Sequence, residues 1–445
     1  MYPPIPAPPN LLVIMTDQQS ADALGCASGG YFHTPNLDRL AARGIRFNKA
    51  YTSQPICVPA RCSMLTGLMP HETGVMYNIS QGQMNGEPLS RLIDEAGYDT
   101  AYIGKWHIEH DSADLDWHGF RTTAHMRGNH LDADIEQPIR DFLLKEREQP
   151  FFLFASFVNP HDICEVARMI SGQEESYKNG DLPPFPPPHE CPPLPANFAI
   201  PAHEPDAIRE HQLGLKAARD GAPGYIGATF DEGQWRQYRW AYQQLVSLVD
   251  ARIGRLLDAL DDSGQADNTA IIFFSDHGDG NAAHRWHQKN IFYEETARVP
   301  FIVVPPGGCE AAENDTALVN ACLDLFPTLL DYAGLPAPAD LLGRSVRPMV
   351  EGTARTAHEY VVSQTNLHLA YGQPGPTNGR MLCTADYKYV HFDSGDIREQ
   401  LFHLASDPGE TQSLCLDPAH RQALEHHREL LRSWITDTAD PYSFT

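Results

Sequence analysis

Short apolar segments that alternate with helical patterns are the strongest constraint on how this chain can fold. Each apolar segment has the length of one buried strand and reads as a strand of a parallel sheet. The patterns between them have the apolar spacing of helices, with Pro near the start or Gly at the end in several cases. The sequence therefore predicts an α/β domain with a mainly parallel sheet flanked by helices. The apolar segments are residues 10–17, 98–104, 150–158, 269–276 and 299–304, and the helical patterns are residues 34–44, 88–97, 132–147 and 232–260.

The pattern changes after about residue 340. Short alternating segments, typical of an antiparallel sheet, are followed by an acidic turn region and a last helical pattern. We expect residues 1–340 to form the large α/β domain and residues 341–445 a smaller C-terminal α+β subdomain. The expected strands of that subdomain are residues 358–365, 379–386 and 387–393, and its expected helix is residues 418–435.

Proline dominates residues 181–206. Because proline fixes φ and lacks an N–H donor, this segment can be neither a helix nor an interior strand. It is either a surface connection or a wall beside an active site, since long ordered loops are often functional.

Composition excludes several kinds of partner. The formal net charge is −25, and no Lys or Arg cluster of the kind that binds phosphate backbones or anionic lipid is visible. No apolar run approaches the ~20 residues of a membrane-spanning helix. We therefore expect no nucleic acid and no membrane as partner. The N-terminus lacks the features of a secretory signal, so the chain as written is expected to be cytoplasmic, or periplasmic or secreted if a leader has been removed.

Polar residues at two strand ends indicate a cation site. Asp17 and Gln18 end the first apolar segment, and Asp276 and His277 end a later one. In open α/β sheets, ligands bind at the carboxyl ends of the strands. Oxygen ligands suit Ca²⁺, Mg²⁺ or Mn²⁺, and the imidazole shifts the preference away from a purely hard ion. Each Asp taken alone is more often a helix cap.

The segment CVPARCSMLTG places a cysteine thiol at the start of a predicted helix. Pro59 fits the first helical position, which would leave Cys57 just outside the helix, at the positive end of its dipole. That position suits an anion or an activated nucleophile. Arg61 lies one turn further on, with a guanidinium able to hold an oxyanion. The nine cysteines form no CxxC pairs, so neither a zinc ribbon nor a disulfide framework is expected.

Four further residues could join this site. If residues 101–107 are extended, Lys105 and His107 project from one face of the strand as a cation and a general acid or base. His161 follows the strand at 150–158, and Lys289 lies twelve residues beyond His277. Taken singly, each would be read as a surface or structural residue.

Together these residues resemble a family. CVPARCSMLTG is similar to the CxPxR signature of the formylglycine-dependent type I sulfatases, in which a maturing enzyme oxidises the cysteine to an aldehyde. The segments PNLLVIMTDQ, TPNLDRLAARGIRF, GYDTAYIGKWH, DLFPTLLDYAGLP and LFHLASDPGE also occur in the order of that family. An ordered set is far more specific than one short motif. The resemblance implies an alkaline-phosphatase-like α/β domain with a smaller C-terminal subdomain.

The resemblance also implies roles for the candidate residues. Cys57, converted to formylglycine and hydrated, would attack the sulfur of a sulfate ester, and a formylglycine-generating enzyme would be a partner. One divalent metal, Ca²⁺ or else Mn²⁺ or Mg²⁺, would be held by residue 57 and four others, which are Asp17, Gln18, Asp276 and His277. Arg61 and Lys105 would orient the nucleophile and the sulfate. His107 would deprotonate residue 57, Lys289 would contact the ester oxygen, and His161 would protonate the leaving alcohol.

Two positions depart from the commonest sulfatase pattern and keep other activities open. Gln18 stands where many members have Asp, and His277 where many have Asn, and both changes also occur in phosphonate monoester hydrolases. Lys105 and His107, however, form the sulfatase-like pair, so a sulfate monoester is favoured over a phosphonate monoester or phosphodiester. A non-catalytic binding protein with unoxidised Cys57 is a further alternative, disfavoured because clustered charges without a ligand would repel one another.

The organic part of the substrate is indicated by a loop just before Lys289. His284, Arg285 and Trp286 are suited to a sugar, with Trp for stacking and the others for hydroxyl or carboxylate groups. The alternative is a loop packed on its own Trp. We expect a small carbohydrate O-sulfate, because the net charge would repel a long polyanion. Choline and aryl sulfates remain alternatives.

Overall fold

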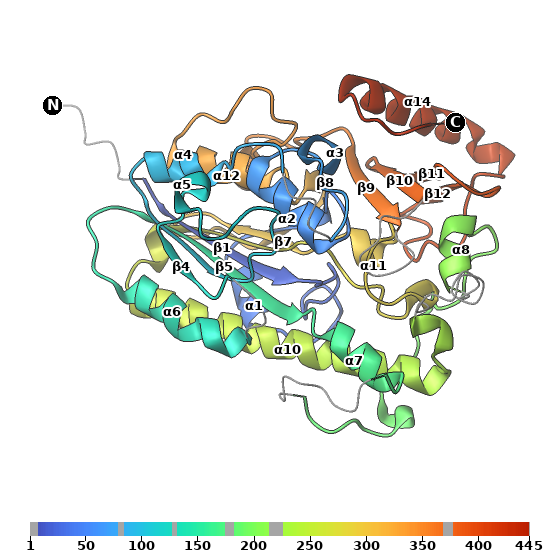
Figure 1. Cartoon of the computed structure of the whole chain (residues 1–445), viewed down its shortest axis with the longest axis horizontal. Coiled ribbons are helices and arrows are strands. Elements are labelled where there is room, and N and C mark those ends of the chain that lie inside the picture. Colours follow the sequence, from blue (N-terminus) through green and yellow to red (C-terminus); the bar gives the residue numbers. More distant parts are fainter. Residues whose placement is uncertain are drawn as a thin grey trace.

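The computed structural model describes residues 8–78, 84–126, 131–173, 182–212, 226–367 and 377–444. An eight-stranded sheet forms its centre, in the order β4-β3-β5-β1-β6-β7-β2-β8, and a four-stranded sheet lies toward the C-terminus (Figure 1). All pairings in the large sheet are parallel except those of β7 with β6 and β2. The predicted mainly parallel sheet is therefore confirmed. Its strands are β1 (Asn10–Asp17), β2 (Ile45–Tyr51), β3 (Asp99–Gly104), β4 (Thr122–Ala124), β5 (Phe151–Pro160), β6 (Thr269–Ser275), β7 (Phe301–Val304) and β8 (Ala312–Asn320).

Helices cover both faces of this sheet. Along β1, Leu11 and Val13 point into one apolar core and Leu12 and Ile14 into the other, as the two-residue period of a strand requires. The first core lies under α2 (Cys57–Thr66), α4 (Ser90–Glu95) and α12 (Leu325–Ala333), and the second under α1 (Pro35–Ala41), α6 (Asp132–Leu144) and α10 (Glu232–Asp262). Figure 1 shows these two helical layers above and below the strands.

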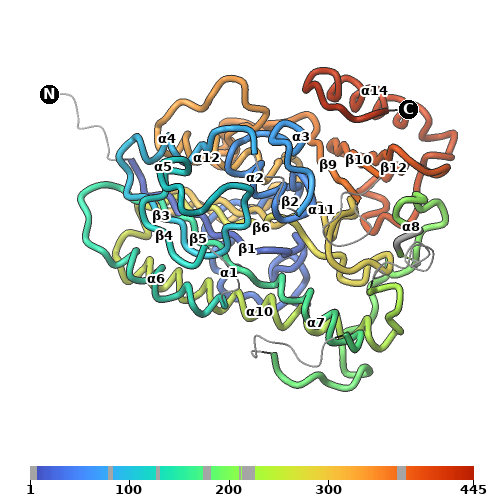
Figure 2. Tube along the Cα trace, viewed as in Figure 1, coloured from blue at the N-terminus to red at the C-terminus, as the bar shows by residue number. Residues whose placement is uncertain are grey.

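The C-terminal sheet is fully antiparallel, in the order β12-β11-β10-β9. One face packs on α14 (Arg421–Asp437) through Leu382, Leu401 and Trp434. The other face packs on the part of the chain that contains the large sheet, where Phe292 contacts Phe392. The tube in Figure 2 shows this sheet beside the end of the large sheet. The strands are β9 (Val361–Leu367), β10 (Thr377–Cys383), β11 (Tyr387–Phe392) and β12 (Glu399–His403).

Among its described residues, 182–206, the proline-rich segment contains only a 3-10 turn, η1 (Pro188–Glu190), before α8 (Asp206–Gln212) begins. Its first residue, 181, lies outside the described residues. Asn197 anchors the segment by donating from Nδ2 to Glu295 at 2.8 Å and to the Gly409 carbonyl at 3.1 Å. The His284 N–H also donates to the Asn197 carbonyl at 2.8 Å, so the segment packs against the loop that precedes Lys289. Among the described residues, no helix is long and apolar enough to cross a membrane.

Candidate active site

Two carboxylates lie together at the carboxyl edge of the large sheet. Asp17 ends β1, and Asp276 directly follows the neighbouring parallel strand β6. Both are buried, and Arg61 donates to each at 2.8 Å, from Nη2 to Asp17 and from Nε to Asp276. Burial and the charge of Asp17 raise the pKa of Asp276. Burial also opposes ionisation of Asp17, but Lys105, His161 and Arg61 hold its pKa well below the usual range.

Cys57 lies directly above this pair. Its Sγ is 2.9 Å from Lys289 Nζ and 3.1 Å from His277 Nε2. Burial opposes ionisation of the thiol, yet Lys289 and His277 lower the pKa of Cys57 well below its usual range. A group with these neighbours is stabilised as an anion.

The predicted start of the helix at Pro59 is wrong. Cys57 itself is the first residue of α2, and Ile56 is the N-cap. No N–H in the first turn of a helix has an acceptor within the helix, so Pro59 fits the third position without losing a hydrogen bond. The first such bond runs from the Ala60 N–H to the Ile56 carbonyl at 3.2 Å. Cys57 still lies at the positive end of the helix dipole.

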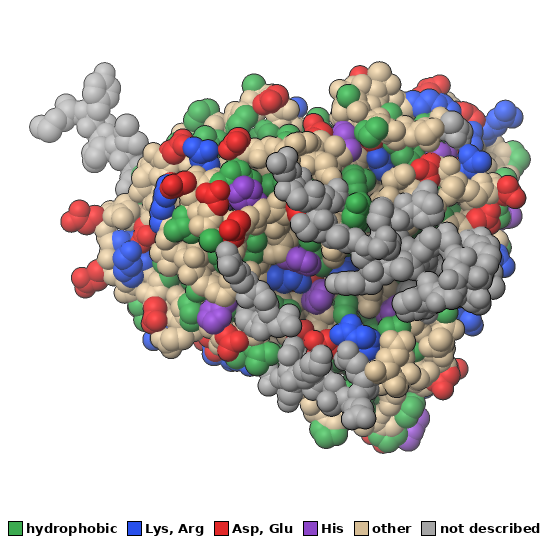
Figure 3. All heavy atoms as spheres, viewed as in Figure 1, with side chains coloured by type: hydrophobic (Ala, Val, Ile, Leu, Met, Phe, Trp, Pro, Cys, Tyr) green, Lys and Arg blue, Asp and Glu red, His purple; other side chains and the backbone are tan. Residues whose placement is uncertain are grey.

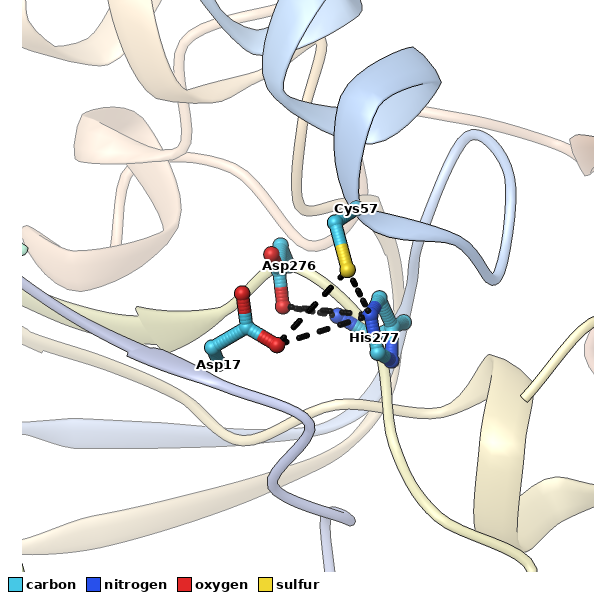
Figure 4. Close-up of side chains that lie close together, drawn as sticks. All are labelled: Asp17, Cys57, Asp276 and His277. Atoms are coloured by element: carbon cyan, nitrogen blue, oxygen red, sulfur yellow. Dashed lines mark hydrogen bonds and ion pairs between the residues drawn. The ribbon is translucent and has the colours of Figure 1, made fainter. Parts of the chain in front are cut away.

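Four side chains form a group that could hold a metal ion. Asp17, Cys57, Asp276 and His277 each offer a ligand atom, and these atoms all lie within 4.8 Å of one another (Figure 4). His277 Nδ1 donates to the Gly278 carbonyl at 2.9 Å, which directs Nε2 into the group. Two carboxylates and an imidazole in a buried site suit a divalent cation. The residues present therefore fit the metal that the sequence led us to expect.

Gln18 brings an amide oxygen to the same place. Its Oε1 lies 3.0 Å from Lys289 Nζ, and its Nε2 donates to Asp279 at 2.7 Å. Its backbone has a φ of 73°, and the Gln18 N–H donates to Asp276 at 3.2 Å. The chain thus turns at Gln18, directly after β1, so that Asp17 and Gln18 both face the cluster.

Lysines make the site electropositive. Lys105 Nζ lies 2.7 Å from Asp17 Oδ2, and 14% of its side chain is exposed, so it faces the opening of the site. Lys289 is buried, and its carbonyl accepts from Trp286 Nε1 at 2.9 Å. With Arg61, three cations surround two carboxylates. Figure 3 shows Lys, Arg and His side chains together in the middle of the face in view. An anion is favoured here even though the whole chain carries a net charge of −25.

His107 and His161 lie beside Cys57 on separate loops, and His107 contributes to the low pKa of Cys57. The prediction that residues 101–107 are one extended strand is wrong beyond Gly104, where β3 ends, and His107 has a φ of 50°. The turn, and not strand alternation, brings Lys105 and His107 to the site. Burial, followed by the charges of Lys105 and Lys289, lowers the pKa of His161 to about 4. His161 follows β5 directly.

The loop at 284–286 differs from its prediction. His284 is fully buried and stacks on Tyr293 with ring centroids 3.7 Å apart, and Trp286 is buried with its N–H bound to the Lys289 carbonyl. Neither side chain offers a surface on which a sugar could stack. The alternative, a loop packed on its own Trp, describes both residues. Arg285 is exposed, with its guanidinium 5.2 Å from the centre of the Phe198 ring.

Several supporting residues were missed from the sequence. Thr52 Oγ1 donates to the Asp276 carbonyl at 2.6 Å, and Arg61 donates to Ser156 Oγ at 3.1 Å. Asp279, three residues after Asp276, binds the Gln18 amide. The one sequence signal for it is the second acidic residue of SDHGDG.

Comparison with known proteins identifies the family of this chain. Residues 9–335 match the family model described as Sulfatase. The chain belongs to the sulfatase family. Residues 282–436 of this sulfatase also match the model described as N-sulphoglucosamine sulphohydrolase, C-terminal. The predicted alkaline-phosphatase-like fold and the predicted sulfuric ester hydrolase activity are thereby confirmed.

Named relatives cover nearly the whole of this sulfatase. A Delta 4,5-hexuronate-2-O-sulfatase of Bacteroides thetaiotaomicron is 32% identical over 98% of this chain and 90% of its own length. An N-acetylglucosamine-6-O-sulfatase of the same organism is 27% identical, covering 91% of this chain and 82% of its own. A solved structure described as a 2-O GAG sulfatase superposes with a TM-score of 0.83 at 30% identity, covering 98% of this chain and 93% of the other.

Proposed function

We propose that this sulfatase hydrolyses the O-sulfate of a small carbohydrate, through formylglycine at residue 57 and one divalent cation. The contact that carries the proposal is that of Cys57 Sγ with Lys289 Nζ at 2.9 Å. It supports an anionic nucleophile at residue 57 with a cation beside the ester it attacks. The names of the two relatives support a sugar as the alcohol.

The proposed nucleophile is an oxygen of the hydrated formylglycine at residue 57. Arg61 is held by both carboxylates, so it is rigid and orients the nucleophile. Lys105, partly exposed beside Asp17, binds the non-bridging sulfate oxygens. Lys289 stabilises the charge that develops on the bridging oxygen, because a donor placed where charge develops lowers the barrier.

Two histidines move the protons. His161 directly follows β5 and lies beside Cys57, and we assign it as the acid that protonates the leaving alcohol. The negative charge of a bound sulfate would favour its imidazolium form, which burial and two lysines disfavour. His107 Nδ1 is buried and, among the described residues, has no hydrogen-bond partner. We assign it as the base that removes the proton of the second hydroxyl of residue 57, which releases sulfate and restores the aldehyde.

We propose Ca²⁺ as the cation, with Mn²⁺ or Mg²⁺ as alternatives, held by Asp17, Gln18, Asp276 and His277 together with residue 57. The bound cation would lower the pKa of the attacking oxygen and neutralise charge on the sulfate. Two carboxylates and an amide oxygen are hard ligands, which favours these cations over Zn²⁺ or Cu²⁺.

The formylglycine-generating enzyme is the second partner that we propose. Cys57 is fully buried in the folded chain, so we expect the maturing enzyme to act before folding is complete.

Two expectations from the sequence stay proposals. They are the division of the chain at residue 340 and the compartment. A phosphonate, choline or aryl ester is a weaker candidate, because the two relatives carry the names of sugar sulfatases.

A substrate panel tests the proposal. Protein coexpressed with a formylglycine-generating enzyme would be assayed on mono- and disaccharide O-sulfates, an aryl sulfate, choline sulfate and a phosphonate monoester. We expect the highest kcat/KM on a sulfated saccharide. Turnover of the aryl ester alone would contradict the sugar assignment, and faster turnover of the phosphonate would contradict sulfate as the preferred group. The variant Cys57→Ala serves as the inactive control.

A further inference from the structure

One buried carboxylate, that of Asp279, lies next to the group of side chains that could hold a metal ion, and the proposed mechanism does not use it. Asp279 is fully buried, and it accepts four hydrogen bonds. Its Oδ2 accepts from Gln18 Nε2 at 2.7 Å, from Tyr238 Oη at 2.7 Å and from the Gln288 N–H at 3.1 Å, and its Oδ1 accepts from the Asn281 N–H at 2.7 Å. No Lys or Arg of the described part of the chain forms an ion pair with it. Every neighbour is a donor, so the carboxylate acts as an acceptor only.

This pattern fixes the direction of the Gln18 amide. The amide has one donating and one accepting end, and its Nε2 is held by the Asp279 carboxylate. Its Oε1 therefore faces Lys289 Nζ at 3.0 Å and the cluster. The reversed amide would place two oxygens 2.7 Å apart at Asp279 and two donors together at Lys289. The carboxylate thus excludes one of the two orientations.

Asp279 also reaches the other side of the site. The Gln288 N–H that it accepts belongs to the residue before Lys289, and Gln288 has a left-handed backbone with a φ of 63°. One carboxylate therefore holds both the amide that faces the cation site and the backbone that carries the lysine beside Cys57.

We propose that Asp279 is a positioning residue that turns Gln18 into an oxygen ligand for the divalent cation, and that residues 18 and 279 are a matched pair. An acid at both positions would place two carboxylates in hydrogen-bond contact in a buried site, where like charges repel strongly. The part of this inference that concerns the cation rests on the proposed function, whereas the matched pair itself does not.

A double-mutant cycle tests the pair. The proteins are the parent, Asp279→Asn, Gln18→Glu and the double variant that combines these two changes, each with unmodified Cys57. A fifth protein, Asp279→Leu, removes the acceptor of the Gln18 amide. In the double variant the amide introduced at position 279 can donate to the carboxylate introduced at position 18, which reverses the polarity of the contact at constant size and charge. Isothermal titration with Ca²⁺, which requires no turnover, gives the affinity, and urea unfolding in chelator gives the midpoint without metal.

Asp279→Leu, which leaves no acceptor for Gln18 Nε2, should weaken Ca²⁺ binding by about 10- to 100-fold, the usual cost of losing a group that orients a ligand. Gln18→Glu should lower the urea midpoint, because the new carboxylate lies against that of Asp279. We expect this even though the change adds a negative charge to the cation site. The double variant should have a tighter Ca²⁺ affinity and a higher urea midpoint than Gln18→Glu. Asp250→Leu is the matched control, because Asp250 is 1% exposed and accepts the Leu37 N–H at 2.8 Å on α1. It should lower the midpoint and leave the Ca²⁺ affinity unchanged.

Each outcome decides a separate point. Unchanged Ca²⁺ affinity in Asp279→Leu would overturn the positioning role. A double variant with a urea midpoint no higher than that of Gln18→Glu would overturn the matched pair, whatever the metal result. If the parent bound none of Ca²⁺, Mg²⁺ and Mn²⁺, the proposed metal site would fail and the positioning role toward the cation would fail with it, while the unfolding cycle would still decide the pair.

Discussion

Replacement of Arg61 gives a direct test of how the carboxylate pair is held. Arg61 is fully buried and donates to Asp17 and Asp276 at 2.8 Å, and from Nη1 to the Lys105 carbonyl at 2.7 Å. Arg61→Met would leave two buried carboxylates close together without the guanidinium between them. Removing one partner of a buried ion pair costs about 3–5 kcal/mol, and with two carboxylates affected we expect the upper end.

Arg61→Lys retains the charge but loses the planar guanidinium, which donates to both carboxylates at once. A lysine can reach one carboxylate well, so one charge-assisted hydrogen bond is lost, at about 1.5–3 kcal/mol. We therefore expect the order parent, Lys variant, Met variant in the free energy of unfolding. Urea unfolding followed by circular dichroism, in chelator and with unmodified Cys57, measures it. Because the stability of a domain is only about 5–15 kcal/mol, the Lys variant keeps the test usable if the Met variant does not fold.

A surface pair supplies the control. Arg255 pairs with Glu136, but 48% of its side chain is exposed. Arg255→Met should therefore cost less than about 1 kcal/mol. Saturating Ca²⁺ should reduce the loss in Arg61→Met, because the cation neutralises the same two carboxylates. A loss below about 1 kcal/mol for Arg61→Met in chelator would refute the reasoning.

Three further predictions concern single groups. Lys289→Met should lower kcat on a sulfated sugar by about 100-fold, and an unchanged kcat would exclude its role at the ester oxygen. His161→Gln should lower kcat by about 100-fold on a sugar sulfate and far less on an aryl sulfate, whose phenolate leaves without a proton; equal losses would contradict a general acid. Burial raises the pKa of Glu204 from 4.5 to about 8 despite hydrogen bonds from Tyr293, Gln400 and Gln212, so the folded state holds an extra proton between these pH values. Unfolding free energy should therefore fall by up to roughly 5 kcal/mol as pH rises from 4.5 to 8, and Glu204→Gln should flatten that fall; an equally steep fall in the variant would refute it.

Much of the fold could be predicted because continuous apolar runs specify the central strands. β1, β3, β5 and β6 lie within two residues of their predicted bounds. The missed strands β2, β4, β8 and β12 are partly exposed or short, as in AENDTALVN of β8, which begins with polar residues and lacks an apolar run. The antiparallel direction of β7 depends on the loop that precedes it and has no local signal.

Only the part of the candidate site that lies at strand ends and helix starts could be predicted from the sequence. Asp17, Asp276 and Cys57 were identified in that way, and the structure brings them within reach of one cation. Residues that act through another residue leave no such signal. Asp279 is buried, and only the tertiary fold shows that it faces the Gln18 amide. The same limit explains why His284 and Trp286 were predicted to bind a sugar. Their residue types suit both packing and sugar binding, and only their burial in the structure decides for packing.

The central claim, that residue 57 is the nucleophile as formylglycine, is tested most directly by the mass of the peptide that spans it. Protein made with and without a formylglycine-generating enzyme would be digested, the fraction of modified peptide measured, and the same samples assayed on a sulfate ester. We expect a loss of about 18 Da relative to cysteine, as when the thiol becomes an aldehyde, and activity proportional to the modified fraction. Full activity in protein whose residue 57 is entirely cysteine would contradict it.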